Sequence, residues 1–286
     1  MAASTAALRG ITKQYKDFTL GPVDMTVPAG SIVGLIGENG AGKTTLLKIL
    51  CGVNRADDGT VDLLGGSPAD AATRAKIGVV FEDAFFYGTF TAAQVARSLA
   101  GMYGARWNAD SFSAYLRRFG LDAGKKLKEY SRGMRLKLSL AAALAHDPEL
   151  LVLDEPTAGL DPVVRGELLD LFLEFIQDER HSIVMSSHIT ADLEQIADSI
   201  AYLHNGQLLF QENKDDLLQE YGVLHCGEDV LTSLPAGLVV FTRRGAYGCE
   251  SLVRERRTVQ ELLPEAVCDA ARLDDIMRFY SGRDAQ

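Results

Sequence analysis

Apolar and polar residues alternate in two early segments of the chain and form continuous apolar runs in others. The segment Val23 to Val27 alternates between apolar and polar residues. Gly59 to Leu64 begins at the last residue of the turn-like sequence ADDG. Both patterns are typical of strands with one buried face, which predicts an antiparallel sheet. Between them, SIVGLIG has the pattern of a strand buried on both faces, followed by a glycine-rich loop and the helical pattern TTLLKILCGV.

The middle of the chain is predicted to contain a helical insert at about residues 85–147. A strand pattern at Lys76 to Phe81 precedes helical periodicity from Thr91 to Leu144, which is broken at GARWNAD and GLDAGKK. Strand patterns return at LLVLD and SIVMSSH, with the amphipathic helix VVRGELLDLFLEFIQDER between them. This β-α-β order predicts an α/β fold with a central, mostly parallel sheet that the insert divides in sequence.

The chain is less regular after the strand SIVMSSH and in its first ten residues. The sequence IAYLHNGQLLF predicts a hairpin that turns on Asn205-Gly206. From about Asp215 a helix, short strands and a final helix at Leu273 to Tyr280 predict a small C-terminal extension, residues 213–286. The first ten residues, MAASTAALRG, are small and polar, and we expect a loose end there.

Composition narrows the class of protein. The 286 residues are 47% hydrophobic, enough for a substantial core, but the apolar runs are of strand length and far shorter than the roughly 20 residues of a membrane span. The N-terminus lacks the pattern of a secretory signal, so a cytoplasmic protein is expected. The net charge of −10 argues against nucleic acid as a partner. Four scattered cysteines predict reduced, mostly buried thiols.

A phosphate-binding loop is the strongest chemical signal. Gly37 to Thr44, GENGAGKT, fits the pattern G-x-x-x-x-G-K-[ST] and lies between a buried strand and a helix start. Such glycines let successive backbone N–H groups and the helix N-terminus point at phosphate oxygens. Lys43 would add a cation at the β- and γ-phosphates, and the Thr44 hydroxyl would bind Mg²⁺.

Adjacent carboxylates at the end of the strand LLVLD complete a phosphoryl-transfer hypothesis. Asp154 would reach the Mg²⁺ shell, and Glu155 would orient and polarise a water for in-line attack on the γ-phosphate. By itself, the sequence DEP after a strand is more often just the start of a loop. Together with the phosphate loop, they predict an ATPase with ATP and Mg²⁺ as cofactors.

The ordered set GENGAGKTT, YSRGM, LLVLDEPTAGLDP and SSH resembles the ATP-binding-cassette (ABC) ATPases over residues 5–212. The resemblance implies the cassette fold of P-loop NTPases: a mixed central sheet, an antiparallel β subdomain and an inserted helical subdomain. It also implies a second ABC ATPase subunit, identical or different, because in this family each ATP lies between the phosphate loop of one subunit and the signature motif of the other.

The resemblance assigns roles to further residues. Besides Lys43, Thr44 and the two carboxylates, it implies nucleotide contacts from the adenine-stacking Tyr15, the signature residues Ser131 and Gly133, the dimer-signalling Asp161, the γ-phosphate contact His188, and the loop residues Gly37, Asn39, Gly40, Ala41, Gly42 and Thr45. With Glu155 and Lys43, His188 is predicted to be catalytic. A strand-face aromatic is the simpler alternative for Tyr15, and an ordinary capped helix is the alternative for the signature.

Three positions depart from the family pattern, two in the signature and one after the strand Lys76 to Phe81. In the signature, Arg132 replaces a glycine and Met134 a glutamine, while Ser131 and Gly133 remain. Arg132 would add positive charge near the nucleotide, or its β-carbon would obstruct close approach. Glu82 stands where the family commonly has a glutamine, so it either binds the metal through water or turns away from the phosphates.

These departures resemble bacterial export-type ABC ATPases, as does the C-terminal sequence ARLDDIMRFYSG. The resemblance implies an ATPase subunit on the inner face of the membrane that powers a separate permease, with a drug, peptide or lipid-like cargo. The aromatic run Phe85 to Tyr87 would either pack in the core or receive a short helix of that permease. Two alternatives remain: an ABC-type ATPase acting on ribosomes or DNA, and a regulatory switch with low turnover.

Overall fold

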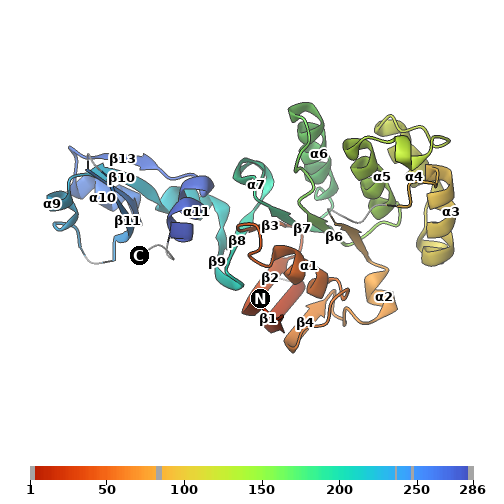
Figure 1. The fold of residues 1–286 in the computed structure, drawn as a ribbon, viewed down its shortest axis with the longest axis horizontal. Coiled ribbons are helices and arrows are strands. Elements are labelled where there is room, and N and C mark those ends of the chain that lie inside the picture. Colours follow the sequence, from red (N-terminus) through yellow and green to blue (C-terminus); the bar gives the residue numbers. More distant parts are fainter. Residues whose placement is uncertain (1–3, 82–85, 236, 246–247, 283–286) are drawn as a thin grey trace. The chain divides into compact units, whose positions relative to one another are not determined.

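The computed structural model describes residues 4–81, 86–235, 237–245 and 248–282, and Figure 1 labels its helices and strands. The chain forms two compact units. Unit 1 comprises Met1–Ile189 and Ala201–Gln211, and unit 2 comprises Thr190–Ile200 and Glu212–Gln286. The chain therefore enters unit 2 twice, first over one short segment and then for the rest of its length.

A six-stranded sheet with the order β5-β6-β7-β3-β8-β9 forms the centre of unit 1. Its strands are β3 (Ile32–Ile36), β5 (Ile77–Val80), β6 (Leu150–Asp154), β7 (Ser182–Ser187), β8 (Ser199–His204) and β9 (Gln207–Asn213). β3 is parallel to β7, and β6 is parallel to both β7 and β5. Every residue of β3, β6 and β7 is buried, which explains their continuous apolar patterns. The predicted sheet, divided in sequence by helices, is confirmed.

The predicted hairpin between β8 and β9 is also confirmed. Asn205 has φ 47° and Gly206 has φ 80°, the two left-handed residues that a type I′ turn requires. A side chain at Gly206 would collide with the backbone carbonyl of Thr19. Glycine is therefore required here both for its conformation and for the close approach of another segment of unit 1.

An antiparallel sheet with the order β2-β1-β4 packs in the same unit. It consists of β1 (Ser4–Gln14), β2 (Thr19–Pro28) and β4 (Asp58–Leu63). The two predicted strands are confirmed, but the expectation of a loose N-terminus is wrong from residue 4 onward. The segment is the central strand, with Leu8 and Ile11 fully buried. Hydrogen bonds to strands on both sides, which lie elsewhere in the sequence, order this weakly patterned segment.

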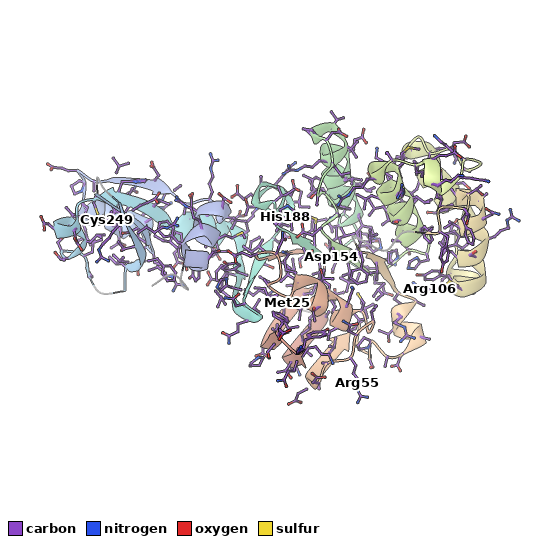
Figure 2. The ribbon with its side chains drawn as sticks, viewed as in Figure 1. Met25, Arg55, Arg106, Asp154, His188 and Cys249 are labelled. Carbon is purple, nitrogen blue, oxygen red and sulfur yellow. The ribbon has the colours of Figure 1, made fainter. Side chains whose placement is uncertain are left out.

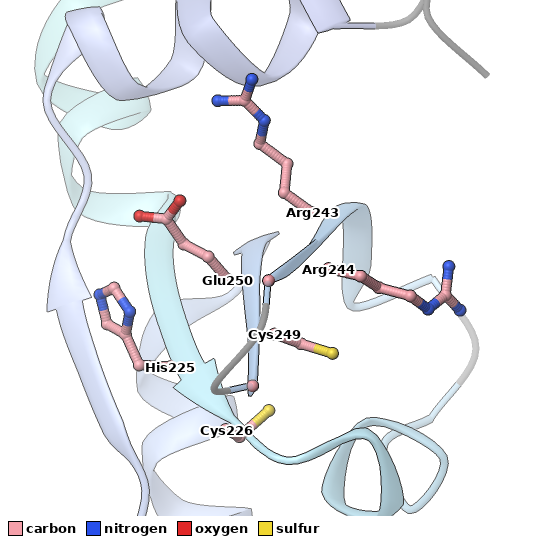
Figure 3. A pocket seen from close by; sticks show the side chains of 8 residues that line it. His225, Cys226, Arg243, Arg244, Cys249 and Glu250 are labelled. Carbon is pink, nitrogen blue, oxygen red and sulfur yellow. The ribbon is translucent and has the colours of Figure 1, made fainter.

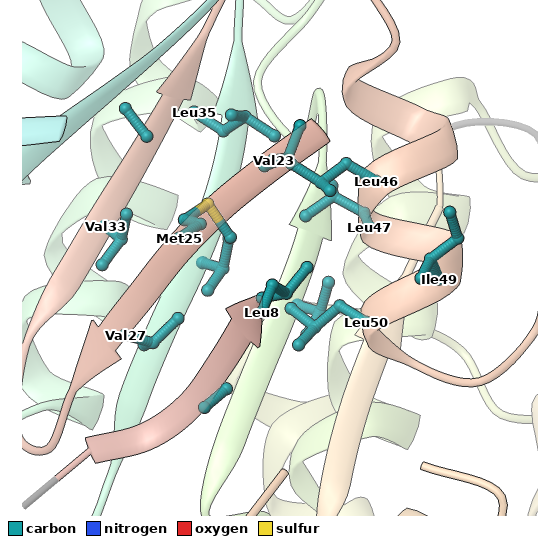
Figure 4. Packing of buried hydrophobic residues seen from close by; sticks show 14 of the residues in the cluster. Leu8, Val23, Met25, Val27, Val33, Leu35, Leu46, Leu47, Ile49 and Leu50 are labelled. Carbon is teal, nitrogen blue, oxygen red and sulfur yellow. The ribbon is translucent and has the colours of Figure 1, made fainter. Parts of the chain in front are cut away.

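The main core joins this sheet to the first helix, α1 (Lys43–Leu50). Leu8 and Met25 from the antiparallel sheet pack in one cluster with Leu46 and Leu50 from α1 (Figure 4). All four side chains are at most 1% exposed. Because α1 follows the phosphate loop directly, this packing fixes the position of that loop.

We expect Leu46→Ala to lower the free energy of unfolding of unit 1 by about 2–5 kcal/mol, since it leaves a cavity in this cluster. Chemical denaturation followed by circular dichroism measures the shift. The matched control is Met102→Ala, because Met102 is 78% exposed and its loss should change stability by less than about 0.5 kcal/mol. Equal shifts for both variants would contradict the role assigned to the cluster.

Helices occupy the predicted insert between β5 and β6. They are α3 (Ala92–Tyr103), α4 (Ala109–Arg118) and α5 (Arg132–Leu144), with the short 3₁₀ helices η1 (Gly104–Arg106) and η2 (Leu127–Glu129). Their inner faces form a separate cluster that includes Val95, Phe112 and Leu138. Phe86 is partly buried against this cluster, whereas Tyr87 is 79% exposed, and Phe85 lies outside the described residues.

The remaining helices of unit 1 are α2 (Ala71–Arg74) and α6 (Pro162–Phe175). The second of these joins β6 to β7, as the predicted β-α-β unit requires. Its proline is at the first turn and Asp161 caps it, which gives the helix a defined start. Within the described residues, none of the helices combines the length and the apolar character that a membrane span needs.

Unit 2 contains a four-stranded antiparallel sheet with the order β11-β12-β10-β13. Its elements are α7 (Thr190–Ile196), α8 (Lys214–Glu220), β10 (Gly222–Cys226), α9 (Glu228–Leu231), β11 (Val239–Gly245), β12 (Gly248–Val253), α10 (Arg256–Leu262), β13 (Val267–Ala270) and α11 (Leu273–Ser281). The final helix, predicted from sequence, begins where Leu273 N donates to Glu194 Oε1 of α7 at 2.8 Å. All four cysteines are free thiols and all but Cys226 are buried, as predicted.

Candidate functional site

The loop Gly37 to Thr44 runs from the end of β3 into α1 in the conformation that its glycines allow. Gly40 and Gly42 have φ 86° and 105°, which favour glycine strongly. A β-carbon at Gly37 would lie 2.2 Å from the carbonyl oxygen of Leu203, so no larger residue fits there. Gly42 precedes the helix without a side-chain cap. The first N–H groups of α1 are therefore left for another acceptor.

A cavity of about 240 Å³ opens over this loop. Its lining consists of Phe18, Glu38, Asn39, Gly40, Gly42, Lys43, Thr44, Thr45 and Glu155. Left-handed glycines and an uncapped helix start beside a buried cation form the arrangement that binds phosphate groups. The residues present thus fit the triphosphate of a nucleotide.

Lys43 is 6% exposed and lines the cavity at the loop. Its Nζ donates to the carbonyl oxygen of Gly37 at 2.7 Å and is 3.3 Å from Glu155 Oε1. Although Glu155 Oε1 is buried, it accepts no hydrogen bond from the described residues. The Lys43 ammonium offsets the charge of this carboxylate, and the free hydrogen-bonding capacity of Oε1 suits it to accept a hydrogen bond from a water or ligand in the cavity.

The two carboxylates differ in their surroundings. Asp154 is 3% exposed, and its Oδ2 accepts from the hydroxyl of Thr44 at 2.8 Å. The hydroxyl and the carboxylate predicted to bind Mg²⁺ therefore meet, although they are far apart in sequence. Hard oxygen ligands of this kind suit Mg²⁺.

Glu155 begins the loop after β6 in a left-handed conformation, with φ 50°. This is uncommon for a residue other than glycine and is found at functional sites. Its Oε2 is 2.7 Å from His188 Nδ1 and accepts from the backbone N–H of His188 at 3.2 Å. Figure 2 labels Asp154, the last residue of β6, and His188, which directly follows the neighbouring strand β7. Glu155 therefore lies between a lysine and a histidine.

Ser186, to which the sequence pattern assigned no role, is fully buried and contacts both acids. Its Oγ donates to Asp154 Oδ1 at 2.6 Å and accepts from the backbone N–H of Glu155 at 3.0 Å. A serine in SIVMSSH gives no signal by itself. Its role depends on the register in which Asp154 lies opposite Ser186.

We expect Ser186→Ala to lower kcat for ATP hydrolysis about tenfold, corresponding to about 1.4 kcal/mol, because Asp154 loses a charge-assisted hydrogen bond. Steady-state kinetics over a range of Mg²⁺ concentrations measures it. Ser186→Thr retains the hydroxyl and should restore most of the activity. Ser139→Ala is the control, since Ser139 is also buried but its Oγ has no partner among the described residues. Equal activity of the two alanine variants would refute the role.

Tyr15 lies beside the loop region but does not contribute to the cavity lining described above. It is 42% exposed, and its ring centroid is 6.4 Å from that of Phe18. Phe18 does line the cavity and closely approaches Gly42. The aromatic next to the phosphate loop is thus a residue that the sequence analysis did not select.

The signature residues lie at the start of α5, and none of them belongs to the cavity lining. Ser131 caps the helix by accepting from Met134 N at 3.2 Å. Asp161 caps α6 by accepting from Val163 N and Val164 N, each at 3.1 Å. The two helix starts are neighbours, because a β-carbon at Gly133 would lie 3.5 Å from the side chain of Leu160. These residues therefore do not line the cavity at the phosphate loop of their own chain.

Arg132 lies along the loop before α6. A β-carbon placed on Gly159 would come 3.2 Å from its Nη1 and 3.5 Å from its Cζ. Arg132 thus extends over a glycine of its own chain. Glu82, the other departure from the family pattern, lies outside the described residues.

Comparisons with known proteins point to one family. A family model described as ABC transporter matches residues 20–158. An uncharacterized ABC transporter ATP-binding protein of Synechocystis sp. is 39% identical over 206 residues, covering 70% of this chain and 58% of that protein. The bacitracin transport ATP-binding protein BcrA of Enterococcus faecalis is 36% identical over 212 residues, covering 72% of this chain and 68% of BcrA.

The fold agrees with the comparisons. A solved structure described as the ATP binding subunit of an ABC transporter matches with a TM-score of 0.66 and 28% identity, covering 75% of this chain and 92% of that one. The predicted fold class, α/β with a mixed central sheet, an antiparallel β subdomain and inserted helices, is confirmed. The matched part of the Synechocystis protein leaves more than a third of its length without a counterpart here.

Proposed function

Since this chain belongs to the ATP-binding subunits of ABC transporters, a family of ATPases, we propose that it hydrolyses MgATP at the Gly37–Thr44 cavity to power a separate membrane permease. One observation carries the proposal. Lys43, Thr44, Asp154, Glu155 and His188 come from distant segments and meet at one phosphate-binding loop. Such a constellation combines anion binding, hard metal ligands and a poised carboxylate.

The loop and its lysine would bind the triphosphate. Backbone N–H groups from the loop residues and the start of α1 would hold phosphate oxygens, and Lys43 would exchange its contact with the Gly37 carbonyl for one with phosphate. The backbone and side chains in this role are those of Gly37, Asn39, Gly40, Ala41, Gly42, Lys43, Thr44 and Thr45. Thr44 and Asp154 would hold Mg²⁺, which neutralises charge on the phosphates when bound.

Glu155 would orient the attacking water, because its buried Oε1 is ion-paired with Lys43 but accepts no hydrogen bond from the described residues. His188 holds the other oxygen, Oε2, through both its ring and its backbone N–H. The histidine thereby fixes the direction of the carboxylate and would itself contact the γ-phosphate. Positioning of this kind is the main contribution of protein groups to phosphoryl transfer.

A second ABC ATPase subunit would complete the site. Ser131, Gly133 and Asp161 lie at neighbouring helix starts apart from the cavity of their own chain, which supports a role across a dimer. The start of α5 would then face the nucleotide bound by the partner, where its N–H groups favour phosphate. We retain Tyr15 as the proposed adenine contact and Glu82 as a proposed metal contact.

We propose that the chain lies on the cytoplasmic face of the membrane and serves export of a drug, peptide or lipid-like cargo. The bacitracin transport protein among its relatives supports a peptide or antibiotic cargo. In this proposal residues 5–212 form the ATPase domain, with helical residues 85–147, and residues 213–286 form the extension. The alternatives are an ABC-type ATPase that acts on ribosomes or DNA, and a nucleotide-dependent regulatory switch with low turnover.

Copurification from detergent-solubilised membranes of the native host tests whether the chain binds a membrane permease. An integral membrane protein with several spans should copurify with the full chain, while ribosomal proteins or DNA in its place would overturn the proposal.

Tyr87→Ala should reduce the recovery of this partner about tenfold if the exposed aromatic contacts it, as expected for a buried anchor at an interface. Met102→Ala is the matched control, since Met102 is equally exposed on the same helical subdomain.

A further inference from the structure

Two cysteines of unit 2 lie directly opposite each other on neighbouring antiparallel strands. Cys226 is the last residue of β10, and its register partner is Cys249 near the start of β12. Both are free thiols; Cys249 is buried and Cys226 is partly exposed. Their sulfur atoms point toward the same cleft in Figure 3. The pair lies at the end of the strand ladder, where the backbone is less constrained than in its middle.

The cleft beside the two thiols is open and is lined by side chains of both charges. Its volume is about 580 Å³, and its lining includes Cys226, Cys249, Arg243, Arg244 and Glu250. Arg244 lies opposite Cys249 on β11, and its Nε donates to Glu228 at 2.9 Å. A small molecule can therefore reach the partly exposed Cys226 through this cleft.

We propose that Cys226 and Cys249 are an oxidisable dithiol, at which a small-molecule disulfide is reduced while an intramolecular disulfide forms between β10 and β12. Residues directly opposite on antiparallel strands have β-carbons about 4.5–5.5 Å apart. A disulfide needs about 3.5–4.5 Å, so closure requires only a small movement at this end of the sheet.

The reaction balances without a further oxidant. The thiolate of Cys226, the more accessible residue, attacks one sulfur of the small disulfide, forms a mixed disulfide and releases one small thiolate. The Cys249 thiolate then attacks the Cys226 sulfur and releases the second. The two protein thiols lose two electrons and two protons, and the small disulfide becomes two thiols.

The other cysteines are not positioned for this reaction. Cys268 lies opposite Leu224 rather than Cys226, so it is only a diagonal neighbour of Cys226, and β10 lies between its strand and that of Cys249. Cys51 is buried in unit 1, where burial raises the pKa of its thiol to about 12. Burial also raises the pKa of Cys226, and the neighbouring Cys249 adds to this shift. The exchange is therefore expected to be faster at mildly alkaline than at neutral pH.

Glutathione disulfide is the probe for the full chain at mildly alkaline pH. The remaining thiols are then blocked, and the intact mass is compared with that of reduced protein blocked in the same way. Formation of the disulfide removes two hydrogens, about 2 Da, and the oxidised protein also carries two fewer blocking groups. Tryptic digestion without reductant should link the peptide between Lys214 and Arg243, which holds Cys226, to the peptide between Arg244 and Arg254, which holds Cys249.

Cys226→Ser and Cys249→Ser should each abolish the linked peptide, and Cys268→Ser should leave it unchanged. Circular dichroism of the variants shows whether unit 2 still folds. A stable glutathione adduct on Cys226, a Cys226–Cys268 link, or four thiols that remain unoxidised in folded protein would each overturn the proposal. None of these outcomes depends on ATP hydrolysis, so the result is independent of the proposed function.

Discussion

Glu155→Gln is expected to lower the steady-state rate of ATP hydrolysis by at least about 100-fold, the usual effect of removing a group that assists proton transfer. Glutamine keeps the size of the side chain and its ability to accept from His188, which now lies 2.7 Å from Glu155 Oε2. It cannot polarise water as a carboxylate does. A phosphate-release assay measures the rate, and ATP should still bind.

Blocked hydrolysis should also trap a dimer. The molecular mass of Glu155→Gln in solution is expected to double with MgATP and to remain that of a monomer without it. The control is Glu149→Gln, because Glu149 precedes the same strand but is ion-paired to Lys76 at 3.2 Å, away from the site. A variant that hydrolyses ATP normally would refute the role of Glu155, and a persistent monomer would refute an identical partner.

Lys43→Ala should weaken MgATP binding by about 10- to 100-fold, because a charge-assisted hydrogen bond contributes about 1.5–3 kcal/mol. Lys43 is also ion-paired with Glu155 at 3.3 Å, and the two side chains are almost fully buried. Its removal therefore leaves both the phosphates and this carboxylate without their cation. Titration with a fluorescent ATP analogue measures the affinity.

Lys48→Ala is the matched control for this variant. Lys48 is on the same helix, but its Nζ lies 5.5 Å from the centre of the Phe81 ring rather than in the phosphate cavity. Its removal should leave MgATP affinity unchanged within about twofold, as for surface changes away from a site. Equal affinity of Lys43→Ala and Lys48→Ala would show that the loop does not bind triphosphate as described.

Much of the fold followed from local patterns because those patterns have direct physical causes. Strands buried on both faces read as apolar runs, as in β3 and β6, and the Asn205-Gly206 turn requires left-handed residues. The N-terminal strand β1 did not follow, since its small residues gain their order from strands on both sides. In unit 2 the sequence predicted a helix, short strands and the final helix, but not how the short strands pair, because they carry little periodicity.

The sequence by itself determined the phosphate loop, the paired acids Asp154 and Glu155, and the serine that begins the signature helix. Glycines in a fixed spacing and carboxylates after a buried strand express chemistry that depends on neighbours in the chain. Only the tertiary structure decided that Ser186 joins the two acids, that Phe18 lines the cavity, and that Cys226 faces Cys249. These contacts depend on strand register and on segments far apart in sequence, which no local pattern specifies.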